Sequence, residues 1–435
     1  MPPLSTRSKS LLILLVLLAA GEFVMRGPAR FPRAVEVNDF ISPYIQSRAL
    51  VKGLDPYSPE VLVRLWPIEG VNRLEFLAKD LADGSLTTKS GMPTAYPLTC
   101  LLVLAPLAIL PWPAAQLAWL VITVCLTLGA IWSLLEMGGF EKSNWRGYVF
   151  VAFALALAPL HTGLAAGSIV IGTVALCGIA VAREQRGSEV VAGILFGMAT
   201  CLKPQIGLPF LVYYLLRRRW RLSGIAAGVA FAAAALAMAR LGIGDTPWLQ
   251  NYRIANKVML ATGVLSDFTE RNPIRFSLIN LQVLFYAIWR HAAAANVLAL
   301  AISVALFGVW ILLLLRSGSD DVLLPVATLA ILSLFPVYHR FYDGFLLIFP
   351  LCWSLREFSA PHYKFARGAF LLMLPFLVPG GSALEQFQLR RQIPEAITHS
   401  WYWTRIAMPH QIWFLLLLSV LLLWRMAVRR TPDSP

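Results

Sequence analysis

The segment from residue 114 to residue 135 reads AAQLAWLVITVCLTLGAIWSLL and contains no charged side chain. A helix of roughly 20 apolar residues is long enough to cross the hydrocarbon core of a bilayer. Further apolar runs occur at residues 11–20, 98–110 and 412–424. Several of these runs are shorter than a full span, which predicts broken or re-entrant helices whose backbone is buried in protein.

The composition of the whole chain supports the same interpretation. Of its 435 residues, 58% are hydrophobic and only 14% are charged. A soluble domain is about half apolar and about a quarter charged, so this chain lacks the charges that a water-exposed surface needs. We therefore expect an all-α, polytopic transmembrane helical bundle, with residues 1–435 forming one domain that crosses the membrane about 12 times.

The net charge of +14 comes from 37 basic and 23 acidic residues. The basic residues cluster at the ends of apolar runs, as at residues 217–221 (RRRWR) and at Arg425, Arg429 and Arg430. This is the pattern of cytoplasmic loops, which retain Lys and Arg. The expected partners therefore include membrane lipids and exclude nucleic acid.

The same rule predicts which segments face which side. Arg7 and Lys9 precede the first helix, so the chain should enter the membrane from the cytoplasm. Residues 25–95 should form a large first extracytoplasmic loop, with juxtamembrane helices at residues 43–50 and 58–66. Residues 242–275 and 379–410 should form further extracytoplasmic loops.

The apolar region from residue 97 to residue 216 contains six pieces, of which an odd number must cross to bring residues 217–221 to the cytoplasm. We expect a kink within residues 161–168 and a turn at Lys203-Pro204-Gln205. Later spans are expected near residues 222–241, 297–315, 322–337, 345–355, 369–377 and 412–424. Residues 276–289 either cross or lie on the surface.

Asp39 follows the first helix and is flanked by Phe40 and Ile41. A carboxylate held at the membrane surface beside apolar side chains is partly desolvated, which makes it a better proton acceptor. The alternative is a loop Asp that caps the next helix.

Lys203 interrupts two apolar runs and is followed by Pro204. An ionisable residue within a membrane is costly and usually faces a cavity or a partner, here an anionic ligand. The alternative is a cation that extends toward the lipid headgroups from a helix end.

The sequence His339-Arg340-Phe341-Tyr342-Asp343 lies between two apolar runs. Arg and His at this place can bind a phosphate, because a guanidinium offers two parallel hydrogen bonds to its oxygens. The alternative is a turn in which Arg340 pairs with Asp343.

These residues resemble a known family in their order and spacing. An acidic residue after the first helix, followed by ALVKGLDPY at residues 49–57, resembles the first external loop of the GT-C glycosyltransferases of family 87, which use polyprenyl-phosphate sugars. The resemblance continues in YPL at 96–98, APL at 105–107, Trp119, GILFG at 193–197, LKPQ at 202–205, RRRW at 217–220, and His339 with Tyr342. Many relatives have Gly-Gln-x-Asn where this chain has GSIV at residues 167–170.

The resemblance implies a GT-C fold and a membrane glycosyltransferase that moves a hexose, mannose-like, from a polyprenyl-phosphate donor to a hydroxyl of a lipid or glycan acceptor. It implies that Asp39 is the catalytic base of a single inverting displacement. It also implies that Lys203, His339 and Arg340 bind the donor phosphate, with no cofactor and no metal ion. Further substrate contacts are expected from Asp55, Tyr57, Tyr96, Gln205 and Tyr342.

Two other classes of function compete with this one. A transporter or flippase of a lipid-linked sugar should keep paired charges near the bilayer midplane and show related halves, which are not visible in the sequence. A structural or assembly protein of the membrane would leave Asp39 and Lys203 without a role. The expected location is the cell (inner) membrane, with the active site on its extracytoplasmic face.

Overall fold

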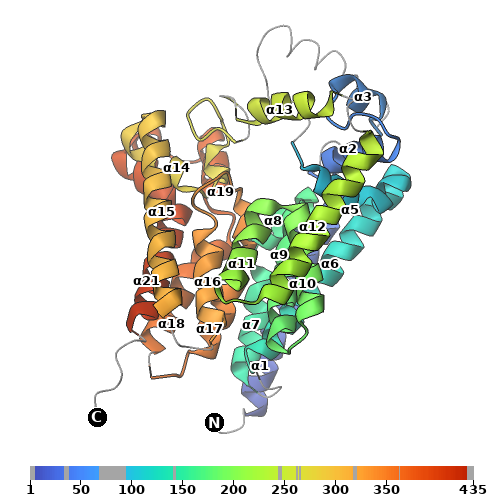
Figure 1. The fold of residues 1–435 in the computed structure, drawn as a ribbon. Helices are drawn as coiled ribbons and strands as arrows, with labels where there is room; N and C mark the ends of the chain where they lie inside the picture. Colours follow the sequence, from blue (N-terminus) through green and yellow to red (C-terminus); the bar gives the residue numbers. More distant parts are fainter. Residues whose placement is uncertain are drawn as a thin grey trace.

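The computed structural model of this protein is a bundle of helices (Figure 1). The structure describes residues 5–33, 39–67, 95–140, 144–242, 247–260, 263, 266–316, 321–361 and 363–428. No β-strand occurs among these residues, and the one β-bridge joins Leu278 to Arg340. The predicted all-α class is therefore confirmed.

Short 3₁₀ or π segments (η) alternate with α-helices (α) along the described chain. The elements are α1 (Thr6–Arg26), η1 (Pro28–Arg33), α2 (Ile41–Val51), α3 (Pro59–Arg64), α5 (Leu98–Ile109), α6 (Trp112–Met137), α7 (Trp145–Ala156), α8 (Ala158–Ala166), α9 (Ile169–Gln185), α10 (Glu189–Leu202), α11 (Pro204–Leu216), α12 (Trp220–Leu241), α13 (Trp248–Met259), η2 (Arg275–Ser277), α14 (Leu281–Trp289), α15 (Ala292–Arg316), α16 (Leu323–Leu332), η3 (Phe341–Leu347), α17 (Ile348–Arg356), α18 (Tyr363–Met373), η4 (Leu374–Leu377), α19 (Gly380–Leu389), α20 (Glu395–Thr398), η5 (Trp403–Ala407) and α21 (His410–Val428).

Six helical segments in the described part are long and apolar enough to cross a membrane, and the bent pair α7–α8 makes a seventh candidate. Four shorter apolar helices, α5, α10, α11 and α16, accompany them. The start of α1 and the end of α21 both lie at the lower end of the bundle in Figure 1. These helices establish a membrane protein, while the number of about twelve crossings stays a prediction.

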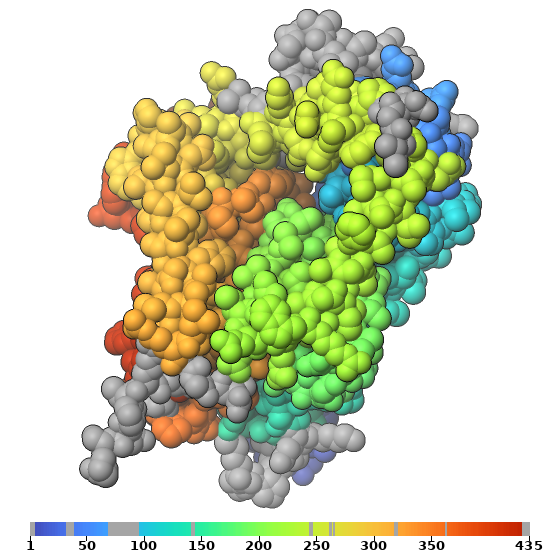
Figure 2. Space-filling model, in the orientation of Figure 1, coloured from blue at the N-terminus to red at the C-terminus, as the bar shows by residue number. Residues whose placement is uncertain are grey.

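The early and late parts of the chain stand beside each other. In Figure 2 the blue to green part, up to α12, occupies one side of the molecule, and the orange part with α15 occupies the other. The two parts are in contact where η3 packs against α8 and α9, and where α11 packs against α16. Residues near 40, 203 and 340 therefore come from both parts and can meet at this junction.

The predicted break within residues 161–168 is present at Gly167 and Ser168, where α8 ends and α9 begins. A further bend of 42°, which was not predicted, lies between α7 and α8. Pro159 lies in the first turn of α8, where its missing amide and fixed φ favour a helix start. Helix α8 then runs through His161 to Gly167, whose left-handed backbone (φ 68°) ends it.

The predicted turn at Lys203 is confirmed. Lys203 is both the C-cap residue of α10 and the N-cap residue of α11. Arg219, which follows α11, forms an ion pair of 3.1 Å with Glu184 at the end of α9, the helix before α10. Residues 183–186 and 217–221 therefore lie at the same end of the bundle, as the charge pattern predicts.

Two glycines set the distance between α10 and α12. A Cβ at Gly193 would lie 2.9 Å from the Leu222 carbonyl oxygen, and one at Gly197 would lie 2.9 Å from the Ala226 carbonyl oxygen. This is the small-xxx-small spacing that lets helix backbones approach closely in membranes. The GILFG motif at residues 193–197 therefore has a packing role.

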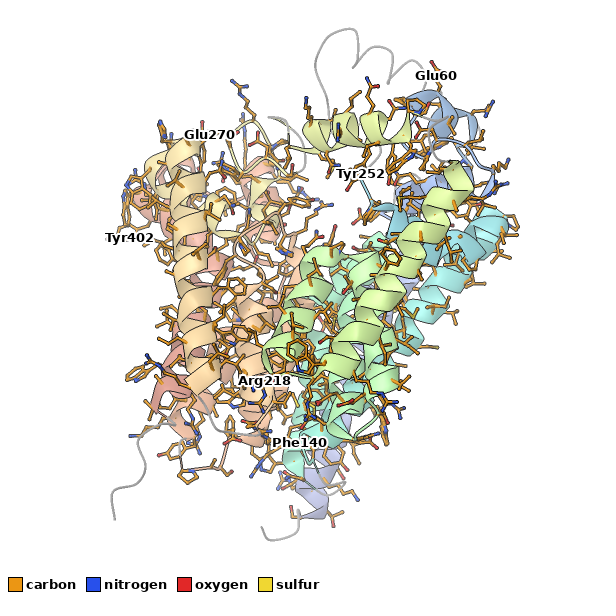
Figure 3. All side chains as sticks on the ribbon, viewed as in Figure 1. Glu60, Phe140, Arg218, Tyr252, Glu270 and Tyr402 are labelled. Atoms are coloured by element: carbon orange, nitrogen blue, oxygen red, sulfur yellow. The ribbon has the colours of Figure 1, made fainter. Side chains whose placement is uncertain are left out.

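The upper end of the bundle in Figure 1 carries α2, α3 and α13, which lie across it. Helices occur at both predicted places, as α2 and as α3 with Ser58 as its N-cap, and their position along a membrane surface stays a prediction. Figure 3 places Glu60, Tyr252 and Glu270 at this upper end, and Arg218 and Phe140 at the lower end. The predicted loops 25–95 and 242–275 fall partly outside the described residues, since these leave out 34–38, 68–94, 243–246, 261–262 and 264–265.

Candidate functional site

Asp343 in η3 joins three other groups of the candidate site. Its Oδ1 lies 2.7 Å from Lys203 Nζ, and its Oδ2 lies 3.1 Å from His339 Nδ1. The same Oδ2 accepts a hydrogen bond of 2.7 Å from the backbone amide of Arg340. The Asp343 side chain is fully buried and that of Lys203 is 11% exposed, so this ion pair is shielded from solvent. We call Asp343, Lys203, His339 and Arg340 the Asp343 cluster.

The electrostatics of the cluster favour an ionised Asp343. Burial by itself would raise the pKa of the Asp343 carboxyl, but the neighbouring Lys203 and His339 lower this pKa to about 2. The carboxylate is thus charged at neutral pH, and its hydrogen bonds hold the Lys203 ammonium and the His339 ring in place.

The chain brings these residues together through two breaks in helical structure. At Lys203 the following proline disfavours helical backbone, and Lys203 adopts an extended conformation (φ −146°, ψ 91°) between α10 and α11. The segment before η3 is also extended, and its His339 carbonyl accepts a hydrogen bond of 3.0 Å from the Ile279 amide. Both breaks place a polar side chain inside an otherwise apolar bundle.

His339 is fully buried, and one of its ring nitrogens is left without a partner. Nδ1 faces Asp343, whereas Nε2 makes no hydrogen bond within the described part of the chain. A carboxylate acceptor at Nδ1 favours the tautomer with the proton on that nitrogen. Nε2 is then an unused acceptor, or a donor when the ring is protonated.

Arg340 connects the Asp343 cluster to Asp39. Its Nη1 lies 3.7 Å from Asp39 Oδ1, with side chains that are 20% and 26% exposed. Its guanidinium carbon also lies 5.4 Å from the centre of the Tyr342 ring, while Lys203 Nζ lies 5.8 Å from that ring. The alternative of an Arg340–Asp343 turn holds for the Arg340 backbone, whose amide donates to Asp343 Oδ2 and whose carbonyl accepts a hydrogen bond of 2.8 Å from the Asp343 amide. The guanidinium instead pairs with Asp39.

Asp39 is not the cap of the following helix. Phe40 is the N-cap residue of α2, which has no side-chain cap hydrogen bond. Asp39 instead donates its backbone amide to the Ala166 carbonyl at 2.7 Å, and its Oδ2 is buried without a hydrogen-bond partner among the described residues. The capping alternative is therefore wrong, and one carboxylate oxygen remains unengaged.

The segment of Asp39 and Phe40 is held in place by contacts with the turn after α8. Phe40 stacks on Trp119 with ring centres 5.2 Å apart, and Trp119 Nε1 donates to the Gly167 carbonyl at 3.1 Å. The GSIV sequence at residues 167–170 begins directly after Ala166, the residue whose carbonyl binds the Asp39 amide. Ala166 also lines a cavity of about 330 Å³, together with Arg26, Arg30 and His161.

Three predicted substrate contacts lie in a separate cluster beneath α13. Asp55 accepts hydrogen bonds from the Tyr57 amide at 2.9 Å and from Asn251 Nδ2 at 2.7 Å. The Tyr57 hydroxyl donates to the Tyr96 carbonyl at 2.6 Å, and burial raises the pKa of Tyr57 well above its usual value. These bonds give Asp55, Tyr57 and Tyr96 a structural role, and their predicted substrate binding stays a prediction.

Two further predicted contacts lie at the Asp343 cluster. Tyr342 is 9% exposed, and its ring receives both cations. Gln205 lies in the first turn of α11, two residues after Lys203, and its side chain makes no hydrogen bond within the ranges that the structure describes. Among those same ranges, no group of three or more His, Cys, Asp or Glu side chains has the geometry to hold a metal ion.

Asp343 was predicted only as the partner of Arg340 in a turn, and no role was predicted for Asn251. Two features of the sequence indicate Asp343 as a member of the site. It follows His339 by four residues, and a lysine inside a membrane, here Lys203, requires a counter-ion. Asn251 lies almost two hundred residues after Asp55 and carries no local signal of that contact.

A model of glycosyltransferase family 87 matches residues 94–337, which is more than half of the chain. Tyr96, Lys203 and Gln205 lie within the matched range, whereas Asp39, Asp55 and Tyr57 precede it and His339, Arg340 and Tyr342 follow it. No curated protein and no solved structure matches this chain.

Proposed function

This chain belongs to glycosyltransferase family 87, and we propose that it moves a hexose, mannose-like, from a polyprenyl-phosphate donor to a hydroxyl of a lipid or glycan acceptor. Membership of the family and the apolar helices make it a membrane glycosyltransferase. The proposed donor, acceptor, mechanism and extracytoplasmic face go further and rest on the chemistry of the candidate site.

The observation that carries the proposal is the connection from Asp39 to Lys203. Asp39 pairs with the guanidinium of Arg340, whose backbone amide binds Asp343, which in turn binds Lys203 and His339. A carboxylate with one oxygen that no described residue engages thus lies next to a group of cations. A displacement that leaves a phosphate behind needs both a proton acceptor and positive charge near the departing oxygen.

In the proposed step, the acceptor hydroxyl attacks the anomeric carbon of the sugar. Its proton passes to the carboxylate of Asp39, and a bond forms between the acceptor oxygen and the anomeric carbon. The bond between that carbon and the phosphate oxygen breaks, and its electron pair leaves with the polyprenyl phosphate. One displacement with one base inverts the configuration at the anomeric carbon.

The cations of the site are partly neutralised before any substrate binds. Lys203 and Arg340 each face one carboxylate, Asp343 and Asp39 respectively. An ammonium has three N–H donors and a guanidinium has five, so each keeps donors for phosphate oxygens. His339 Nε2 adds one more donor when the ring is protonated. The phosphate would therefore be bound through these remaining donors, because the two carboxylates already balance the charges of Lys203 and Arg340.

The turn at residues 167–170 bears on which sugar is used. Val170 is 1% exposed and Ser168 caps α9 through its hydroxyl, so neither side chain offers the two amides that many relatives carry. Because this turn holds Asp39 through Ala166, a sugar bound for attack lies close to it. We propose that this chain contacts its sugar differently at that position. We propose that one substrate occupies the cavity that Ala166 lines, because the Ala166 carbonyl also binds the Asp39 amide.

The test is a transfer assay with purified protein in vesicles and a panel of polyprenyl-phosphate sugars. We expect a glycosylated acceptor to form from one donor without added nucleotide sugar. A transporter of lipid-linked sugars would instead move the donor between leaflets and form no new glycosidic bond. Movement of the donor without a glycosylated product, for every sugar in the panel, would contradict the proposed function.

A further inference from the structure

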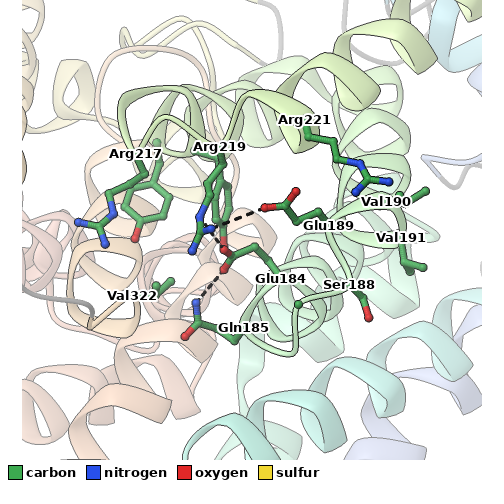
Figure 4. A pocket seen from close by; sticks show the side chains of 13 residues that line it. Glu184, Gln185, Ser188, Glu189, Val190, Val191, Arg217, Arg219, Arg221 and Val322 are labelled. Carbon is green, nitrogen blue, oxygen red and sulfur yellow. Dashed lines mark hydrogen bonds and ion pairs between the residues drawn. The ribbon is translucent and has the colours of Figure 1, made fainter.

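A second polar site lies at the end of the bundle opposite to Asp39, where Figure 3 places Arg218. The chain forms a cavity of about 660 Å³ there, between the end of α9, the start of α10 and the turn after α11 (Figure 4). Arg217, Arg219, Arg221, Glu184, Glu189 and Tyr214 are among its lining residues. The proposed sugar transfer uses none of these residues.

One of the three arginines holds both acidic side chains. Glu184 is buried and lies 3.1 Å from Arg219 Nε, while Gln185 donates to its other oxygen at 2.7 Å. Glu189 lies 3.6 Å from Nη1 of the same Arg219. Arg221 lines the cavity and forms no ion pair with any residue that the structure describes. The lining thus keeps positive charge that its carboxylates do not engage.

The start of α10 adds backbone donors to this charge. Ser188 is the N-cap of this 14-residue helix, yet its side chain makes no cap hydrogen bond. Gly187, Ser188, Val190 and Val191 all line the cavity. The first amides of a helix have no partner within the helix and carry a partial positive charge, which favours a bound anion.

A buried hydroxyl provides an independent sign of a ligand. Tyr214 is 1% exposed and lines the cavity, and its hydroxyl has no hydrogen-bond partner within the described residues. A buried polar group without a partner costs free energy, which a ligand oxygen that accepts from this hydroxyl would recover. The cavity therefore combines guanidinium, amide and hydroxyl donors.

We propose that this cavity binds the phosphate head group of an anionic phospholipid from the leaflet at this end of the bundle. The outer face of α10 next to the cavity exposes Val190, Val191 and Ile194, and Trp220 is 64% exposed at the start of α12. These apolar side chains offer a surface to the acyl chains, which a soluble phosphate does not need. Basic pockets between membrane helices on the cytoplasmic side bind acidic head groups in this way.

The test is native mass spectrometry of the delipidated full-length protein, titrated with phosphatidylglycerol or with phosphatidylcholine. The first should bind more tightly than the second. In Arg221→Gln its affinity should fall roughly fivefold, the effect of about one surface cation on an acidic head group. Tyr214→Phe, which removes only the hydroxyl, should also weaken it. Arg316→Gln is the matched control, since Arg316 is an exposed arginine at the same end outside the cavity.

Three results would overturn the proposal. Equal affinity for the two lipids would remove the requirement for an acidic head group. Equal losses in Arg221→Gln and Arg316→Gln would show general surface attraction in place of a site. Complete displacement of the lipid by inorganic phosphate would assign the cavity to a soluble anion. Each result is independent of sugar transfer, which takes place at the other end.

Discussion

Asp343 is the residue that organises the candidate site, although it makes no contact with Asp39 itself. It is fully buried and binds one cation, one imidazole and one backbone amide. Removing one partner of a buried ion pair leaves an uncompensated charge, which is more costly than replacing both partners. This asymmetry allows the structural role of the pair to be separated from its catalytic role.

We expect Asp343→Asn to lower the free energy of unfolding by about 3 kcal/mol, because it leaves the Lys203 ammonium buried without a counter-ion. The double variant Asp343→Asn with Lys203→Met should regain part of this stability. It should not regain sugar transfer, because it lacks the cation proposed to bind the donor phosphate. Thermal unfolding in detergent and the transfer rate measure the two effects.

Recovery of both stability and transfer in the double variant would contradict a phosphate-binding role for Lys203. The ion pair would then serve the fold alone. If the double variant is as unstable as Asp343→Asn, the Asp343 carboxylate stabilises the site through His339 and Arg340 more than through Lys203.

The sequence predicted part of this site at the level of residues. Lys203, His339 and Arg340 were singled out because charged groups inside apolar runs need a reason to be there, and the structure brings them together with Asp39. Asp55, Tyr57 and Tyr96 were grouped with them through a family resemblance and lie in another cluster. Their partner Asn251 is distant in sequence, and only the folded chain shows that contact.

At the scale of elements, the α10–α11 hairpin determines where Lys203 stands. A Cβ at Gly207 would lie 2.5 Å from the backbone nitrogen of Thr200, so the two helices touch at this glycine. We expect Gly207→Ala to destabilise the protein by about 1–3 kcal/mol through overpacking and to reduce transfer by moving Lys203. Thermal unfolding and the transfer rate provide the measurement.

Gly228→Ala in α12 is the control for Gly207→Ala, since a Cβ there would meet nothing within 4 Å. It should leave transfer unchanged and stability equal or slightly higher, because Ala favours a helix over Gly. Equal behaviour of the two variants would show that the hairpin is not closely packed at Gly207.

Helix α13 is held over the upper end of the bundle by a single described side-chain hydrogen bond to Asp55, from Asn251, and by the packing of Tyr252 on Tyr57. Asn251→Ala should leave the buried Asp55 without this partner and loosen α13 by about 1–3 kcal/mol. Trypsin should then cleave faster at Arg253 or Lys257 within α13. Trypsin should cleave the control variant Gln250→Ala, which changes an exposed neighbour of Asn251, at the wild-type rate.

Most elements follow from the sequence, because apolar runs and capping signals are local. Ser58 starts α3, and Lys203-Pro204 separates α10 from α11, as predicted. The break predicted within residues 161–168 lies at the end of that range, where Gly167 ends α8 and Ser168 caps α9. The bend between α7 and α8 was not predicted. Its cause is Pro159 in the first turn of α8, and the helix tolerates His161 through a hydrogen bond to the Leu155 carbonyl.

At the scale of the whole molecule, the proposed transfer site and the basic segment at residues 217–221 must lie on opposite sides of the membrane. Glu60 and Glu270 lie at one end of the bundle, which also carries α2, and Arg218 lies at the other (Figure 3). Asp39 precedes α2 by two residues. We expect a membrane-impermeant maleimide to label Glu60→Cys and Glu270→Cys from one side of sealed vesicles, and Arg218→Cys only from the other. Labelling of all three positions from one side would contradict the arrangement of the bundle in the membrane.

The sequence predicts a polytopic helical protein with its basic clusters at one end, because hydropathy and charge act along the chain. It does not determine how many of the short helices cross. Helices α10, α11 and α16 are 10 to 14 residues long. Helix α16 is buried by its neighbours, whereas α10 and α11 each expose an apolar face, so length alone does not decide whether they span the bilayer.

The central claim is that Asp39 accepts the proton of the acceptor hydroxyl at a site shared with Lys203 and His339. The most direct measurement is the rate of sugar transfer by Asp39→Asn, with Glu60→Gln as the matched loss of an exposed carboxylate at the same end. The account predicts a fall of about 100-fold or more in Asp39→Asn, as expected for a general base, and an unchanged rate in Glu60→Gln. Transfer by Asp39→Asn at the wild-type rate would contradict it.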